Sequence, residues 1–356
     1  MLSVLKYCFG LKRADKGGER NMKRIILGIP LLVAVLVFFP VRSFAAMPRS
    51  ATLATHAVGG LYNALGTGIG TVISRYTPTT VRVQPFAGPP AWLPSMDKGE
   101  TDMGILTSAD AITSYKGIII YKRPHTGTRI LISGGRIYLG FYVRSDSDIK
   151  SVSELKGRRV PTDFPGIPIA RLSSTATLAS SGLSYNDIVK VPVSDLAAGG
   201  SAFLEGRLDA GWDAVGSPRV IEANSRFRGG VRFLPTDSGP EATKRMGDIY
   251  PGSYTALVAG GSATGVVKDT YLMTNDIYLV ATKFMSDDVA YEIVKILWER
   301  NEDLGPLHPG LKEWTRDRMA NPSVFIPYHP GAVKFLKEKG VWSKEMDALQ
   351  ARLLAD

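Results

Sequence analysis

The segment Thr52–Gly70 constrains the fold more than any other, because it predicts a strand, a glycine turn and a helix in succession. Residues 51–55 are apolar and β-branched, as expected for a short buried strand. A turn follows from His56 to Gly60, and apolar residues then recur at helical spacing. The start of such a helix presents unpaired N–H groups and a positive dipole end, which suits an anion. The segment is therefore interpreted as a binding site. The alternative is an ordinary strand-to-helix turn without a ligand.

Residues 1–45 predict a leader with a secretory signal peptide. Met22–Arg24 is a basic start, Ile25–Phe39 is an apolar run short for a membrane span, and Ser43–Ala45 supplies small residues for cleavage. We expect Met22 to be the true translation start. An uncleaved N-terminal anchor is the alternative.

The leader changes what the charge balance implies. It holds eight of the 43 Lys and Arg residues but only two of the 33 acidic residues, so much of the net charge of +10 belongs to it. Nucleic-acid binding is therefore not expected. The only cysteine, Cys8, also lies there, so the rest of the chain has no disulfide and no Cys–metal site. These properties fit a soluble protein of the bacterial periplasm.

Strands and helices alternate after the leader, which predicts an α/β fold with parallel strand pairs. Ile137–Val143 is expected to be a strand that leaves the first α/β unit, and Thr274–Ala281 a strand that returns to it. Gly252–Thr270, rich in Gly, Ser and Thr, is expected to be a long connection. The C-terminal helices would pack back on the first unit.

This organisation predicts two lobes with a hinge between them. Lobe I would comprise residues 47–140 and 275–356, and lobe II residues 141–274. Ligands of such folds bind in the crevice beyond the carboxyl ends of the strands.

Motifs for catalysis or metal binding are missing from the sequence. His56, His125, His308 and His329 do not have zinc-motif spacing, and there is no G-x-S-x-G elbow or Walker P-loop. We expect no metal and no cofactor. His56, at the first turn, is the histidine predicted to contact a ligand. Its alternative role is a solvated or hydrogen-bonded turn residue.

Two further strand ends carry candidate binding residues. Thr107 and Ser108 end one buried strand, so their hydroxyl and N–H groups could reach the crevice. Trp212 and Asp213 end another, where Trp212 would stack on a ligand or be buried in the core.

Trp92 and Arg136 are candidates on weaker grounds. Trp92 follows a Gly-Pro-Pro turn and, like Trp212, would either stack on a ligand or be buried in the core. Arg136 precedes the crossing strand, where it would pair with a carboxylate or remain a surface residue.

Five segments, in order, resemble motifs of the TAXI class of TRAP-transporter solute receptors. The first has Gly59, Gly60 and Tyr62 in register with the family's opening turn. The resemblance covers nearly the whole chain after the leader. The five segments are TLATHAVGGLYNALG, KGETDMGILTSAD, SVSELKGRRV, EGRLDAGWDAVGSP and IPYHPGAVKFLKEKGVW.

The resemblance implies a two-lobed periplasmic-binding-protein fold, type II-like, that closes around a small organic anion. It also implies delivery to TRAP membrane subunits, separate or fused, driven by an ion gradient. Transferred by position, the family's ligand contacts fall on Thr55, His56, Ala57, Gly60, Tyr62, Thr107 and Ser108 in lobe I, and on Thr162, Gly166, Trp212, Asp213 and Gly216 in lobe II.

The chain departs from the family pattern in ways that concern the ligand. His56-Ala57 replaces small residues, Phe86–Trp92 replaces a polar segment, and Phe164–Pro168 replaces a turn rich in donors. The pocket should therefore be more apolar and aromatic. We expect either the family's glutamate and C5 dicarboxylates or a carboxylate with an apolar or aromatic body.

The sequence thus predicts a monomeric solute receptor rather than an enzyme. Two alternatives stay open: an exported hydrolase on the same scaffold, and an interaction protein that has lost ligand binding. A Ser, a His and an Asp within hydrogen-bond reach in the crevice would favour the hydrolase.

Overall fold

The computed structural model describes residues 47–355. The predicted signal peptide, its cleavage site and Cys8 lie outside the described residues. Within residues 47–355, none of the helices combines the length and apolarity that crossing a bilayer requires.

Strands and helices alternate through most of the described chain, in agreement with the α/β prediction. The strands are β1 (Ser50–His56), β2 (Thr80–Phe86), β3 (Met103–Thr107), β4 (Thr128–Arg144), β5 (Arg159–Asp163), β6 (Val189–Val193), β7 (Gly211–Ala214), β8 (Val231–Phe233), β9 (Tyr254–Val258) and β10 (Thr270–Thr282). The α-helices are α2 (Leu61–Tyr76), α3 (Pro89–Met96), α4 (Ser108–Lys116), α5 (Pro168–Ser180), α6 (Leu196–Leu204), α7 (Pro218–Arg226), α8 (Pro240–Ile249), α9 (Asp287–Glu299), α10 (Arg316–Met319), α11 (Pro330–Glu338) and α12 (Lys344–Ala355). Short 3-10 turns are η1 (Val152–Leu155), η2 (Asn301–Asp303) and η3 (Pro309–Leu311).

Eight strands form one mixed sheet, in which β2, β1, β3, β10, β4 and β7 are neighbours in that order. The expected parallel pairing holds for β1 with β2 and β3, and for the separate pair β5–β6. The strands around the two crossing strands pair antiparallel instead: β10 with β3, β4 and β9, and β4 with β7 and β8.

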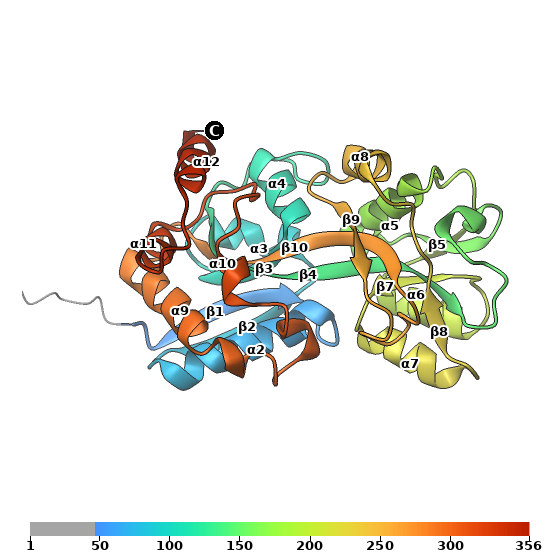
Figure 1. Cartoon of the computed structure of the whole chain (residues 1–356), viewed down its shortest axis with the longest axis horizontal. Coiled ribbons are helices and arrows are strands. Elements are labelled where there is room, and N and C mark those ends of the chain that lie inside the picture. The colour runs from blue at the N-terminus through green and yellow to red at the C-terminus, as the bar shows by residue number, and fades with distance from the viewer. Residues whose placement is uncertain (1–46, 356) are drawn as a thin grey trace, which may run out of the picture. The chain divides into compact units, whose positions relative to one another are not determined.

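The two crossing strands are the longest in the described chain, β4 with 17 residues and β10 with 13. They pair with each other from Thr128–Thr282 at one end to Leu139–Met273 at the other. One end of β10 pairs with β3 and its other end with β9, while the second half of β4 pairs with β7 and β8. Figure 1 shows both strands running from one group of elements to the other. The predicted crossing strands are therefore present, and β4 begins earlier than expected.

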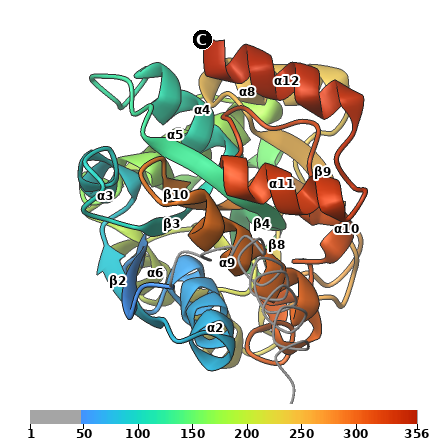
Figure 2. The same ribbon diagram turned by 90° about the vertical axis from the view of Figure 1, so that its left-hand side faces the viewer.

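Two hydrophobic cores lie towards the two ends of this strand pair. One contains residues of β1, α2, β3, α9 and α11, among them Leu53, Leu65 and Ile293. Figure 2 shows α2 and α9 next to each other in this part. The other core contains residues of β5, α6, β7 and β8, among them Phe203 and Phe233. We call these parts lobe I and lobe II, and we propose the limits 47–140 with 275–356 and 141–274 on this division of cores.

The glycines inside α2 serve close packing. A Cβ on Gly66 would collide with the Thr55 side chain, and a Cβ on Gly68 would lie 2.5 Å from Cδ1 of Leu311. All the same, a glycine in the middle of a helix costs roughly 0.5–1 kcal/mol relative to alanine. The cost is offset here because α2 lies close against β1 and the C-terminal segment.

Two elements of lobe II differ from expectation. The connection predicted over Gly252–Thr270 contains strand β9, which pairs with β10 along its length. Helix α8, just before it, was not predicted. Strand β9 is short, only partly buried and flanked by Gly and Ser, so its own sequence gives little strand signal. Pairing with β10 stabilises it as a strand.

The strand pair is irregular where it leaves lobe I. Its register shifts between Asp276 and Tyr278, opposite Gly134 and Gly135. Such a bulge bends and twists a strand. The ring of Trp314, 1% exposed, covers these glycines, and a Cβ on Gly134 would lie 2.5 Å from its Cδ2 atom.

Gly134→Ala is therefore expected to lower the free energy of unfolding by about 1–3 kcal/mol, because the added methyl overpacks the bend. Gly247→Ala is the matched control, since its Cβ would meet no atom within 4 Å and it lies inside α8. The control should gain roughly 0.5–1 kcal/mol from helix propensity. Urea unfolding of both variants measures this, and equal stability of the two would contradict the packing argument.

Candidate functional site

A cavity of about 350 Å³ lies between the two cores, with walls from lobe I, lobe II and both crossing strands. Thirteen of its 25 lining residues are apolar, two are glycines and ten carry a polar or ionisable side chain. Its size and composition are those of a small-molecule site. Its apolar members are Ala57, Val58, Leu61, Ala87, Ile137, Leu139, Ile167, Ile169, Ala170, Leu196, Ala197, Trp212 and Ala214.

The glycine turn after β1 forms the lobe I wall. Gly59 has a φ of +80°, which explains a glycine there, and Gly60 is the N-cap of α2 without a side-chain cap from any described residue. The rings of His56 and Tyr62 contact each other, with centroids 4.3 Å apart. The turn thus brings a helix start and two aromatic rings to the cavity.

His56 is a neutral group in this wall. Its Nε2 atom is buried and has no hydrogen-bond partner among the described residues. Burial lowers the pKa of His56 from 6.5 to about 4, because the charged ring would lose its hydration. At neutral pH His56 therefore offers a hydrogen bond to a ligand but no positive charge.

A hydrogen-bonded carboxyl connects the two lobes beside the cavity. Asp110 is 1% exposed and accepts hydrogen bonds from Thr107 Oγ1 and Tyr250 OH, both at 2.8 Å. Burial raises the pKa of Asp110, although these hydrogen bonds act in the opposite direction. Since Tyr250 belongs to the lobe II core, this carboxyl ties helix α4 to lobe II.

Arg219 is the basic side chain of the lobe II wall. Its Nε donates to Asp213 Oδ2 at 2.6 Å and its Nη2 to Asp213 Oδ1 at 3.1 Å. The Asp213 side chain is 3% exposed and that of Arg219 24%. Burial lowers the pKa of Arg219, but the attraction of Asp213 outweighs this and the pKa is raised. The guanidinium group is held from one side and stays charged.

Local structure explains how this pair forms. Asp213 is the third of the four residues of β7, and α7 begins after a tight turn in which Ser217 Oγ caps the helix and Pro218 is its first residue. Arg219 is thus fixed in the first helical turn, six positions after the carboxylate. This pairing was not predicted from the sequence, where the only signal is an arginine just after a strand-to-helix turn.

Asn275, on β10, is a second cavity residue that was not predicted. It is fully buried, its Oδ1 accepts a hydrogen bond from Ser253 Oγ at 2.9 Å, and its Nδ2 has no partner among the described residues. An unpaired buried amide costs about 1–3 kcal/mol. The Nδ2 group of Asn275 is therefore a hydrogen-bond donor available to a ligand in the cavity.

The structure brings many of the predicted residues together on the cavity wall. Whether they contact a ligand stays a prediction. Those on the wall are His56, Ala57, Gly60, Tyr62, Thr107, Gly166, Trp212 and Asp213.

Trp92 was predicted to be a candidate for stacking, and the structure assigns it to the core instead. It is fully buried in the lobe I core. A Cβ on Gly104 would lie 2.6 Å from its Cη2 atom, so the indole packs flat on strand β3. The Gly-Pro-Pro turn before it starts α3.

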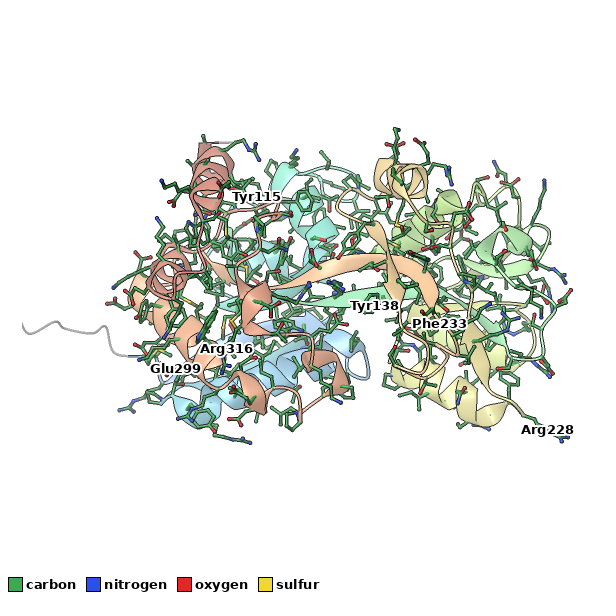
Figure 3. The ribbon with its side chains drawn as sticks, viewed as in Figure 1. Tyr115, Tyr138, Arg228, Phe233, Glu299 and Arg316 are labelled. Atoms are coloured by element: carbon green, nitrogen blue, oxygen red, sulfur yellow. The ribbon has the colours of Figure 1, made fainter. Side chains whose placement is uncertain are left out.

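Arg136 faces away from the cavity. Side chains alternate along a strand, so Ile137 and Leu139 of β4 line the cavity, while Arg136 and Tyr138 lie on the opposite face. Arg136 Nη1 donates to the Tyr138 hydroxyl at 3.3 Å, and that hydroxyl donates to Glu313 Oε1 at 3.0 Å. Figure 3 shows Tyr138 on β4, between the lobes.

The remaining predicted residues lie near the cavity but do not line it. Thr55 is buried behind the wall and accepts a hydrogen bond from Asn63 Nδ2 at 3.1 Å. Ser108 Oγ donates to the Gly252 carbonyl at 3.0 Å, and Thr162 is fully buried. Gly216, with a φ of +79°, shapes the turn before α7.

In the described part of the chain, no group of three or more His, Cys, Asp or Glu residues is arranged to hold a metal ion.

Comparison with known proteins identifies the family. The NMT1-like family model matches residues 53–340, which is most of the chain. The chain belongs to the NMT1-like family. The match includes both lobes and the residues of the cavity.

Solved structures support the two-lobed fold. A structure described as a periplasmic transporter shares 13% identity, covers 86% of this chain and 98% of its own, and has a TM-score of 0.50. The alkanesulfonate-binding protein SsuA from Xanthomonas axonopodis pv. citri, bound to MOPS, shares 18% identity over 85% of this chain and 96% of its own, with a TM-score of 0.39. A TctC solute binding protein from Polaromonas shares 15% identity over 86% of this chain and 94% of its own, with a TM-score of 0.43.

The three structures are described as a periplasmic transporter, an alkanesulfonate-binding protein and a solute binding protein. The predicted α/β fold with two lobes is confirmed. At these identities the likeness concerns the fold and does not extend to a ligand.

His56 makes the stability of the protein depend on pH. The unfolded chain binds a proton at this residue below about pH 6.5, whereas the folded chain binds it only near pH 4. The free energy of unfolding is therefore highest above pH 6.5, as far as His56 determines it, and falls as the pH drops from 6.5 to 4. His56→Gln is expected to flatten part of the fall in melting temperature between pH 6.5 and 4. Identical pH profiles for the variant and the parent would show that the ring is not desolvated.

Proposed function

We propose that the chain is an extracytoplasmic solute receptor that binds a small organic anion, a carboxylate, in the cavity between its lobes. The observation that carries the proposal is Arg219, a charged guanidinium on a mostly apolar cavity wall. A guanidinium group matches the planar geometry of a carboxylate. The cavity size and the relation to periplasmic receptors of the same fold support it.

The pairing of Arg219 with Asp213 favours such a role. Asp213 occupies the Nε and Nη2 groups, and no hydrogen bond joins Nη1 to any described residue. One edge of the guanidinium group is therefore held by the protein and another is available. A buried ion pair contributes little net stability but orients its members, so Asp213 acts as a positioning residue for Arg219.

The transport system is inferred from the sequence resemblance. The TAXI motifs suggest a periplasmic receptor of a tripartite ATP-independent transporter, which delivers its ligand to membrane subunits. The two cores joined by a bent pair of strands support this, because they allow hinge closure around a ligand. We expect a monomer.

The hydrolase alternative finds no support at this site. Ser173 lines the cavity, but its hydroxyl donates to the Ile169 carbonyl at 2.8 Å. Among the described residues of the cavity wall, no serine or threonine hydroxyl is hydrogen-bonded to His56. A nucleophile with its base is therefore not assembled there.

Arg219→Lys tests the proposal. Lysine keeps the charge beside Asp213 but loses the forked geometry, so we expect the dissociation constant for a bound carboxylate to rise by about tenfold or more. Native mass spectrometry of the purified protein and thermal-shift screening of carboxylates identify a ligand first. Calorimetry then measures its affinity.

Arg228→Lys is the matched control, because Arg228 is exposed in lobe II, far from the cavity. It should leave the dissociation constant unchanged. Equal affinity of the Arg219 variant and the control would contradict the role of Arg219. Failure of every carboxylate to bind would contradict the proposed function.

A further inference from the structure

We infer that the ligand is a monocarboxylate with an apolar body, and that the cavity rejects dicarboxylates of equal length. The inference rests on the proposed function and narrows its substrate class. Three features of the cavity support it: the number of cationic side chains on its wall, the hydrogen bonds that already occupy its ionisable groups, and the apolar residues of the lining.

The cavity offers an anion a single cationic side chain. Arg219 is the only lysine or arginine on its wall among the residues that the structure describes. Two of its three nitrogen groups are used by Asp213. One carboxylate can therefore pair with the remaining Nη1 edge, and a second carboxylate would find no cation.

His56 does not supply the missing positive charge. Its buried ring stays neutral at physiological pH, since its pKa is lowered to about 4. The unpaired Nδ2 of Asn275 is likewise an uncharged donor. These two groups can hydrogen-bond a ligand, but they do not offset the cost of desolvating a second charge.

The other ionisable groups on the wall oppose a second carboxylate. Asp110 already accepts hydrogen bonds from Thr107 and Tyr250, so it offers an acceptor where an anion needs donors. Asp195 caps helix α6, its Oδ1 accepting from the Ala198 N–H at 2.9 Å. The charge of Asp195 helps to raise the pKa of Arg219, so this carboxylate lies near the guanidinium group and repels every further negative charge in the cavity.

The rest of the wall suits a hydrocarbon. Ile137 and Leu139 come from β4, Ile167 and Ile169 from the start of α5, and Trp212 from β7. Burying apolar ligand surface against them removes it from water, which favours binding. The same walls offer a distal carboxylate no cationic side chain. A ligand with one charged end and an apolar body satisfies both regions of the cavity.

Matched acids of equal length test the inference by calorimetry at pH 7.5. The pairs are hexanoate with hexanedioate and octanoate with octanedioate, and hexanamide is the uncharged reference. We expect at least one monocarboxylate to bind about tenfold or more tightly than its dicarboxylate partner. We also expect it to bind more tightly than the amide.

The outcomes separate the inference from the proposed function. Dicarboxylates that bind as tightly as the monocarboxylates, or more tightly, would overturn the inference and leave an organic-anion receptor intact. If the amide binds as well as hexanoate, the proposed function fails as well. If none of the four acids binds, the inference is overturned, and the wider carboxylate screen decides the proposed function.

Asp195→Asn tests whether charge, rather than shape, causes the rejection. Asparagine retains the cap of α6 and nearly the same volume. It should narrow the ratio between octanoate and octanedioate affinities several-fold. Asp248→Asn is the control, since Asp248 is exposed on α8 and pairs with Lys244, outside the cavity wall. Equal ratios in the two variants would overturn the charge argument.

Discussion

The antiparallel pairing of β4 with β10 is the interaction on which the rest of this structure depends. Both strands extend beyond a single core: β10 pairs with β3 in lobe I and with β9 in lobe II, and the second half of β4 pairs with β7 and β8 in lobe II. Each lobe thus builds its sheet on the same two strands. Rotation of the lobes requires this pair to bend, and its register shift lies at Gly134 and Gly135.

The same pair determines which groups meet at the cavity. Alternation along the strands turns Ile137 and Asn275 toward the cavity and Arg136 and Asp276 away from it. On the opposite face Asp276 accepts hydrogen bonds from Arg318 Nη2 at 2.8 Å and from Tyr254 OH at 3.2 Å. Because Tyr254 lies on β9 and Arg318 on α10, this face connects both lobes through the strand pair. Figure 1 shows α10 and β9 at these strands.

Buried polar groups give the cavity its chemical character. The pair Arg219–Asp213 and the group around Asp110 are both enclosed by apolar walls, where unpaired charges are costly. Each carboxyl is therefore satisfied by the protein itself. What remains for a ligand is one edge of a guanidinium group, the amide of Asn275, the neutral ring of His56 and a large hydrocarbon surface.

The sequence by itself determined the alternation of strands and helices, the two crossing strands and the turn at His56–Gly60. These features depend on local spacing, on glycine and on helix starts, which neighbouring residues specify. Three residues of the lobe II wall were also predicted: Trp212 and Asp213 from their position near the end of a strand, and Gly166 from the family resemblance.

Only the tertiary structure decided which of two similar tryptophans faces the cavity. Trp92 and Trp212 both stand beside glycine-rich turns, but the first packs on Gly104 of a strand distant in sequence. Arg219 and Asn275 likewise gain their roles from the cavity that both lobes enclose, and β9 exists because β10 pairs with it. Contacts between distant segments leave no periodic signal, so burial, pairing and the charge balance of the cavity follow from packing alone.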